Sequence, residues 1–144
     1  MIAVPAFIII GLQPAGAADT TNLPQLSIPS ISLTTPVEQS QLVNRELTVP
    51  DRNAAFYSED PSKILLIGHS ATVFSNLKNL QIGDEITYNK DLYHVTNIEQ
   101  KNKHIINMKD ILTPVSKQTI ILMTCAGEPL GNNDYTHRLI ITAE

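Results

Sequence analysis

The chain has 144 residues, of which 42% are apolar and 17% charged, and its formal net charge is −4. A chain of this length fits one domain and can bury roughly two-thirds of the surface that it exposes when unfolded. The acidic balance, the absence of tryptophan and the lack of any lysine or arginine cluster argue against nucleic acid as a partner.

The first residues predict an export or anchoring segment. Residues 1–12 are almost entirely apolar, but they are too few to cross a bilayer, since a spanning helix needs about 20 residues. The small residues at 15–17 have the spacing of a signal-peptide cleavage site. No lysine or arginine precedes Arg45, so the positive flank of a signal is missing. A remnant of an anchor or signal is the favoured interpretation, and a buried N-terminal strand is the alternative.

The domain boundary follows from a change in composition. Residues 13–25 are small, polar and proline-bearing, as linkers are. We therefore expect residues 1–25 to form the apolar segment and a linker, and residues 26–144 to form one folded domain.

Strand signals dominate the expected domain. Each segment is rich in β-branched or apolar residues, alternates with polar ones or is bounded by turn residues. In chain order the expected strands are LSIPSISLTTPV (26–37, broken at Pro29), RELTVP (45–50), KILLIGHS (63–70), EITYN (85–89), LYHVTNIE (92–99), QTIILMT (118–124) and HRLIITA (137–143). The runs at 63–70 and 118–124 are apolar without a break, which is typical of strands buried on both faces.

Turns and short helices complete the prediction. The two strands that flank Lys90 and Asp91 predict a hairpin. SNLKNL (75–80) and NMKDILT (107–113) each predict a turn or two of helix. About eight short strands separated by turn signals favour a closed barrel or a sandwich. The predicted fold is all-β, or nearly so.

The only cysteine, Cys125, ends an apolar strand. A thiol at its ordinary pKa is only a few per cent ionised at neutral pH, so a nucleophilic cysteine needs a base or a positive neighbour. His69 ends the apolar run KILLIGH in the same way as Cys125 ends its own run. If these strands are neighbours, the imidazole and the thiol meet at one rim.

Arg138 follows Cys125 across the polar interval AGEPLGNNDYTH, which predicts a connecting loop. A hairpin there would return Arg138 to the side of Cys125, where a guanidinium could bind an oxygen that gains negative charge. Taken alone, the three residues leave the bland alternative open, because a lone cysteine in a β protein is more often a small buried hydrophobe.

Four motifs, GHS (68–70), GDEITY (83–88), IILMTC (120–125) and THRLIITA (136–143), resemble the sortases, the bacterial cysteine transpeptidases. The resemblance extends over residues 26–144 and includes LSIPSISLTTPVE and VFSNLKNLQIGDEI. Its most specific part is the order of a histidine, a Thr-Cys pair that ends an apolar strand, and an arginine in the next strand. No class within the family is assigned.

The resemblance implies a closed eight-stranded β-barrel with short helical turns. It implies that Cys125 attacks the Thr–Gly bond of a signal like Leu-Pro-x-Thr-Gly and forms a thioester, which an amine then resolves. His69 would protonate the leaving glycine amine and deprotonate the incoming amine. Arg138 would hold the substrate and the oxyanion, and Thr124 would line the site through its hydroxyl or its backbone.

The resemblance also implies partners and a location. The substrates would be the sorting signals of surface proteins and an amine of a cell-wall precursor or a pilin lysine. The chain would work outside the cytoplasm at the cell surface, secreted or held to the membrane through its N-terminus. No cofactor is expected; calcium assists some sortases, but the sequence offers no cluster of carboxylates for it.

The segment before the cysteine strand corresponds to the family's substrate-recognition loop. It supplies Leu112 and Pro114 as candidate binding residues, with Ile111 and Val115 beside them. Each of these is equally well explained as a core residue under a loop. The other histidines, His94, His104 and His137, are expected to lie outside the site, His137 because it alternates with Arg138 along a strand.

Three rival functions fit the sequence less well than the sortase interpretation. An L,D-transpeptidase carries an arginine two residues after its cysteine, where this chain has Gly127. A papain-like protease needs its cysteine at the start of a helix, whereas IILMT predicts a strand. A surface-exposed β-barrel binding module with an inert, buried Cys125 explains the strands equally well, but it does not explain why His69, Cys125 and Arg138 stand at strand ends.

Overall fold

The computed structural model describes residues 22–144, so the expectations for residues 1–21 lie outside the described residues. No helix within 22–144 is long and apolar enough to cross a membrane.

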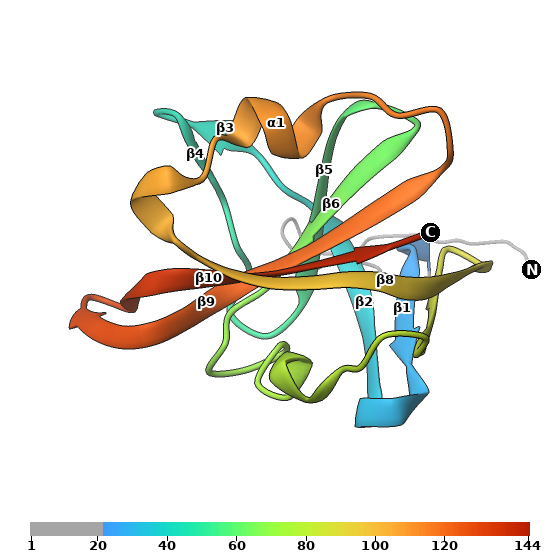
Figure 1. The fold of residues 1–144 in the computed structure, drawn as a ribbon, viewed down its shortest axis with the longest axis horizontal. Helices are drawn as coiled ribbons and strands as arrows, with labels where there is room; N and C mark the ends of the chain where they lie inside the picture. The colour runs from blue at the N-terminus through green and yellow to red at the C-terminus, as the bar shows by residue number, and fades with distance from the viewer. Residues whose placement is uncertain (1–21) are drawn as a thin grey trace, which may run out of the picture.

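Eight strands close into a barrel in the spatial order β1-β2-β5-β6-β9-β10-β8-β7, and β7 pairs with β1 to complete it (Figure 1). These strands are β1 (Gln25–Ile28), β2 (Leu33–Gln39), β5 (Ala54–Asp60), β6 (Lys63–Ile67), β7 (Glu85–Tyr88), β8 (Asp91–Asn102), β9 (Thr119–Gly131) and β10 (Asp134–Ala143). The pairs β2–β5 and β6–β9 are parallel and the other pairs are antiparallel. The prediction of a mainly β, closed eight-stranded barrel is confirmed.

The remaining elements are short. They are the two-stranded sheet of β3 (Leu42–Val43) and β4 (Glu46–Leu47), the 3-10 turns η3 (Pro29–Ile31), η4 (Leu77–Asn79) and η5 (Lys103–Ile105), and the helix α1 (Met108–Leu112). Both expected helical turns are present, as η4 and α1. The β7–β8 hairpin is also present, and its turn residues are Asn89 and Lys90, both with positive φ, as two-residue hairpin turns require.

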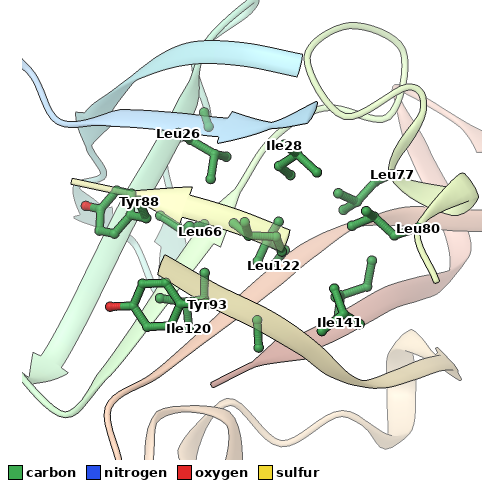
Figure 2. Close-up of a cluster of buried hydrophobic side chains, with 14 of the residues drawn as sticks. Leu26, Ile28, Leu66, Leu77, Leu80, Tyr88, Tyr93, Ile120, Leu122 and Ile141 are labelled. Atoms are coloured by element: carbon green, nitrogen blue, oxygen red, sulfur yellow. The ribbon is translucent and has the colours of Figure 1, made fainter. Parts of the chain in front are cut away.

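The buried apolar residues form two groups, one on each face of the barrel wall. The inner core fills the barrel (Figure 2) and includes Leu26, Ile28, Leu66, Leu77, Leu80, Tyr88, Tyr93, Ile120, Leu122 and Ile141. The outer cluster consists of Ala55, Leu65, Ile67, Leu112, Ile121, Met123 and Ile140. Because α1 covers the outer cluster, β6 and β9 are buried on both faces, which explains their unbroken apolar sequences.

Three parts of the fold differ from the prediction. The strand expected over residues 45–50 is reduced to β4, which pairs with β3 outside the barrel, and Arg45 lies in the turn before it with positive φ. β5, with the sequence AAFYSED, was not predicted, because three of its seven residues are polar or charged and its pattern does not alternate. The interval between Cys125 and Arg138, predicted as a loop, is mostly strand: β9 continues to Gly131 and β10 begins at Asp134. The two strands extend past the barrel as a long hairpin (Figure 1) with Asn132 and Asn133 at its turn.

Candidate active site

The parallel pair β6–β9 brings His69 and Cys125 to the same edge of the barrel. The paired register ends with Ile67 opposite Met123, and His69 and Cys125 each follow two residues later on their own segments. Both side chains are half-buried and both line a cavity of about 900 Å³ on the outer face of the barrel. Cys125 is therefore not a sealed core residue.

Arg138 lies beside Cys125 on the neighbouring strand. The two residues are direct partners in the β9–β10 register, so their side chains leave the sheet on the same face. Arg138 lines the same cavity as His69 and Cys125. The hairpin expected between the cysteine and the arginine is thus present, with the pairing that brings them together.

The guanidinium of Arg138 is held by its own hairpin. Nη1 donates to the carbonyl oxygens of Tyr135 at 3.1 Å and His137 at 2.9 Å, and Nη2 donates to Oδ1 of Asp134 at 3.0 Å. Three of the five N–H donors of the guanidinium are engaged in these bonds. The group is fixed in orientation without any ligand.

Asp134 joins two cations at the wall of the cavity. Its carboxylate accepts hydrogen bonds from Lys103 as well as from Arg138, and all three residues line the cavity. The hydrogen bonds from Lys103 and then from Arg138 hold the pKa of Asp134 below its usual range. Sequence reasoning missed Asp134 and Lys103, which belong to different strands and turns and form no recognisable spacing.

Thr124 and Gly68 tie the two strand ends together. The buried hydroxyl of Thr124 donates to the carbonyl oxygen of Gly68 at 2.7 Å, so it is occupied within the protein. A side chain at Gly68 would have no room, because a Cβ there would lie 2.6 Å from Val73 Cγ1 and 2.9 Å from Phe74 Cδ2. Thr124 lies in the cavity wall, and what it can offer a substrate is its backbone.

The rest of the cavity wall is mainly apolar. Leu112, on α1, is 8% exposed and lines the cavity together with Met108 of the same helix. Pro114 is exposed in the loop that follows α1 and lies outside the cavity lining, as do Ile111 and Val115. Sequence reasoning missed the part of the lining formed by Leu42, Leu47 and Val49 at the β3–β4 sheet.

A second, smaller cavity of about 330 Å³ adjoins the first at the thiol. His69 and Cys125 line both cavities, so the thiol lies where the two meet. Most of the residues that line this second cavity are of polar or charged types, among them Asp51, Thr72 and Tyr135. Cys125 therefore faces two adjoining cavities rather than one.

The other histidines lie apart from these cavities. His94 is exposed, with Nε2 3.8 Å from Glu85 Oε2, and His104 is exposed in η5. His137 pairs with Ala126 and therefore faces away from Arg138; its Nδ1 contacts Thr136 Oγ1 at 2.7 Å. Within residues 22–144, no three His, Cys, Asp or Glu side chains come together in a way that could hold a metal ion.

A family model described as a sortase domain matches residues 26–144. The chain belongs to the sortase family. No curated protein sequence matches it significantly.

Solved sortase structures have the same fold. Sortase C-3 from Streptococcus pneumoniae has 21% identity and a TM-score of 0.62, with 84% of this chain and 61% of that chain covered. Sortase A from Corynebacterium diphtheriae has 24% identity and a TM-score of 0.62 (85% and 59% covered). The sortase D5 transpeptidase from Clostridium perfringens has 19% identity and a TM-score of 0.63 (85% and 77% covered). The chain thus spans about three fifths of the length of the first two, and matches to sortases A, C and D assign no class within the family.

Proposed function

We propose that this chain is a cysteine transpeptidase that cleaves a Leu-Pro-x-Thr-Gly-like sorting signal between Thr and Gly and transfers the acyl group to an amine. The observation that carries the proposal is the position of Cys125, which is the register partner of Arg138, adjoins His69 and stands between two cavities. Membership of the sortase family supports the same chemistry.

In the first half-reaction the Cys125 thiolate attacks the carbonyl carbon of the threonine, and the carbonyl oxygen becomes an oxyanion. Arg138 has its Nε–H and one Nη2–H left for that oxygen after its bonds within the hairpin. The C–N bond then breaks, the imidazolium of His69 gives its proton to the leaving glycine amine, and a thioester remains on Cys125.

In the second half-reaction an amine attacks the thioester carbonyl and gives its proton to the imidazole of His69. The C–S bond breaks, and the thiolate is restored beside the imidazolium. No cofactor is required, because one acyl bond is exchanged for another. The smaller cavity next to Cys125, lined mostly by residues of polar types, is the proposed entrance for the amine, since the larger cavity is taken by the sorting signal.

The apolar cavity suits the Leu and Pro of the sorting signal. Leu112 and Met108 of α1, together with Val49, offer nonpolar contacts. Thr124 would contribute its backbone. Pro114 would take part only if the loop after α1 closes over the bound signal.

The proposed setting is the cell surface, outside the cytoplasm, with the chain secreted or held to the membrane through its N-terminus. The proposed acceptor is the amine of a cell-wall precursor or a pilin lysine. These assignments rest on the sortase family.

The test is the intact mass of the full chain after incubation with a Leu-Pro-x-Thr-Gly peptide. The wild type should gain the mass of the acyl fragment and lose it when an amine is added, whereas Cys125→Ala should gain nothing. A peptide of the same composition in scrambled order is the control. If a panel of motif variants leaves no adduct and Cys125 resists alkylation in the folded state, the proposal fails and the inert binding module is favoured.

A further inference from the structure

A third cavity, of about 420 Å³, continues the path away from Cys125. Arg52, Ala71 and Thr72 line both this outer cavity and the polar cavity next to the thiol. A single ligand can therefore extend from Cys125 past Thr72 into the outer cavity. The outer lining is hydrogen-bonding rather than apolar and includes Ser32, Thr34, Asn53, Ser75 and Asn76.

The segment that carries Arg52 is fixed on both sides. The hydroxyl of Thr72 donates to the carbonyl oxygen of Asp51 at 2.6 Å. On the other side, Asn53 Nδ2 donates to Glu38 Oε2 at 2.8 Å. The backbone of Arg52 is thus anchored at the junction of the two cavities.

Along this path away from Cys125, a negative side chain is followed by a positive one. Asp51 lines only the cavity beside the thiol, whereas Arg52 lines both cavities. Among residues 22–144 no carboxylate forms an ion pair with Arg52, in contrast to Arg138, which is paired with Asp134. An ammonium group is favoured near Asp51, and an anion is favoured further out, near Arg52.

We propose that Arg52 recognises an anionic group, a carboxylate or a phosphate, on the amine acceptor. The acceptor would place its amine near Asp51 and Cys125 and its anion at the junction with the outer cavity. This inference rests on the proposed transpeptidase function and adds the chemical class of its second substrate.

The test measures binding on the full chain with Cys125→Ala, so that no reaction interferes. Three probes of similar length are titrated by NMR: triglycine with a free carboxylate, triglycine amide, and diglycine joined to aminoethyl phosphate. Both anionic probes should bind about fivefold more tightly than the amide, as expected for an exposed charge-assisted contact, and should shift the signals of Thr72 and Asn53. The difference between the carboxylate and the phosphate probe shows which anion the site prefers.

Substitution of Arg52 separates this site from general charge attraction. In Arg52→Gln the anionic and neutral probes should bind equally, and Arg52→Lys should restore part of the difference. Lys78→Gln, which removes an exposed cation outside all three cavities, should leave the preference intact. The inference is overturned if the three probes bind alike, or if the preference survives in Arg52→Gln.

A kinetic arm distinguishes the two proposals. If the wild type forms the thioester, the acceptor KM should be about fivefold lower for the anionic amines, and Arg52→Gln should abolish that advantage. A thioester that forms while the acceptors remain equivalent refutes the role of Arg52 alone. Absence of the thioester refutes the transpeptidase, while the binding titration still reports on Arg52.

Discussion

Arg138 is held in place by its own hairpin before any substrate arrives. Its bonds to two backbone carbonyls and to Asp134 leave the guanidinium little freedom. A donor that is already oriented toward a developing charge spends no energy on reorganisation during the reaction. Asp134, which is itself held by Lys103, is thus a positioning residue for Arg138.

Asp134→Asn should lower kcat about ten- to a hundredfold with little change in KM for the sorting peptide. The substitution removes the charge that orients the guanidinium but leaves the apolar cavity unchanged, and small misplacements of a catalytic group cost factors of this size. Steady-state kinetics with the peptide and an amine measure the effect. Glu128→Gln, an exposed position on the same hairpin, is the matched control and should behave as the wild type. Equal losses in the two variants would contradict the positioning role.

The pH dependence of stability provides a second test at Asp134. Because Lys103 and Arg138 lower its pKa in the folded state, the carboxylate stabilises the fold above the ordinary aspartate pKa of about 3.9, and this contribution is lost as the pH falls. The difference in unfolding midpoint between the wild type and Asp134→Asn should be constant from about pH 5 to 8 and shrink below about pH 4. Urea unfolding at several pH values checks this; a difference that grows toward low pH would contradict it.

Sequence reasoning could find the residues at strand ends but not their supports. His69 and Cys125 end apolar runs of the same kind, and the arginine follows a turn. If their strands are neighbours, the three side chains are expected at the same edge of the sheet. In a regular strand positions 134 and 138 would be about 13 Å apart, because each residue advances about 3.3 Å. The β9–β10 register has two irregularities, on either side of Tyr135, that interrupt this regular spacing between Asp134 and Arg138. No sequence pattern predicts these irregularities.

At the scale of elements, the β9–β10 hairpin is the part that sequence reasoning misjudged. Its outer half has no core to face, so residues 127–133 are polar, glycine-bearing and exposed, with a proline and an isolated leucine among them. This composition is typical of loops. The strands continue there because their backbones hydrogen-bond to each other. The hydrophobic periodicity of the sequence does not reveal this pairing. β5 was missed for the same reason, since its outer end is polar.

Gly127→Ala should destabilise the hairpin more than Gly131→Ala. Both glycines have positive φ, of 84° and 90°, so alanine at either costs roughly 1 to 2 kcal/mol in backbone strain. At Gly127 a Cβ would also lie 2.3 Å from Thr136 Oγ1 and 2.6 Å from His137 Nδ1, whereas at Gly131 nothing lies within 4 Å. Chemical unfolding of the two variants measures the difference.

The activities of the two glycine variants should follow the same order. Gly127 lies two residues from Cys125 and faces the strand that carries Arg138, so a shift there separates the thiol from the guanidinium. The Gly131→Ala variant, changed at the far end of the hairpin, should retain most of the wild-type activity. Equal stability and equal activity in both variants would show that the contact with Thr136 does not constrain the strand.

At the scale of the molecule, the residues that stabilise the barrel and the residues of the proposed site lie on different faces of its wall. The inner core fills the barrel, while the proposed site lies on the outer face, where the outer cluster borders it. The mainly β character could be predicted because the strands alternate or are continuously apolar, but this pattern left a closed barrel and a sandwich equally open. The closure of the barrel was expected only from the resemblance to sortases. The order of the strands depends on long-range pairing and could be predicted only through the resemblance to sortases.

Leu122→Ala should lower the free energy of unfolding by about 2 to 5 kcal/mol, since it leaves a cavity in a fully buried core. Leu92→Ala makes the same chemical change at a side chain that is 55% exposed and should cost less than about 0.5 kcal/mol. Denaturant unfolding compares the two. Similar losses at the two positions would mean that Leu122 does not lie in a sealed core.

Along β9 the side chains alternate: Leu122 and Thr124 belong to the inside of the barrel, and Met123 and Cys125 to the outside. A slip of one residue in the pairing of this strand would turn the sulfur into the core and a threonine outward. The alkylation rate of the single thiol therefore distinguishes correctly paired molecules from slipped ones. Titrating that thiol would therefore count the correctly paired molecules among those that are folded.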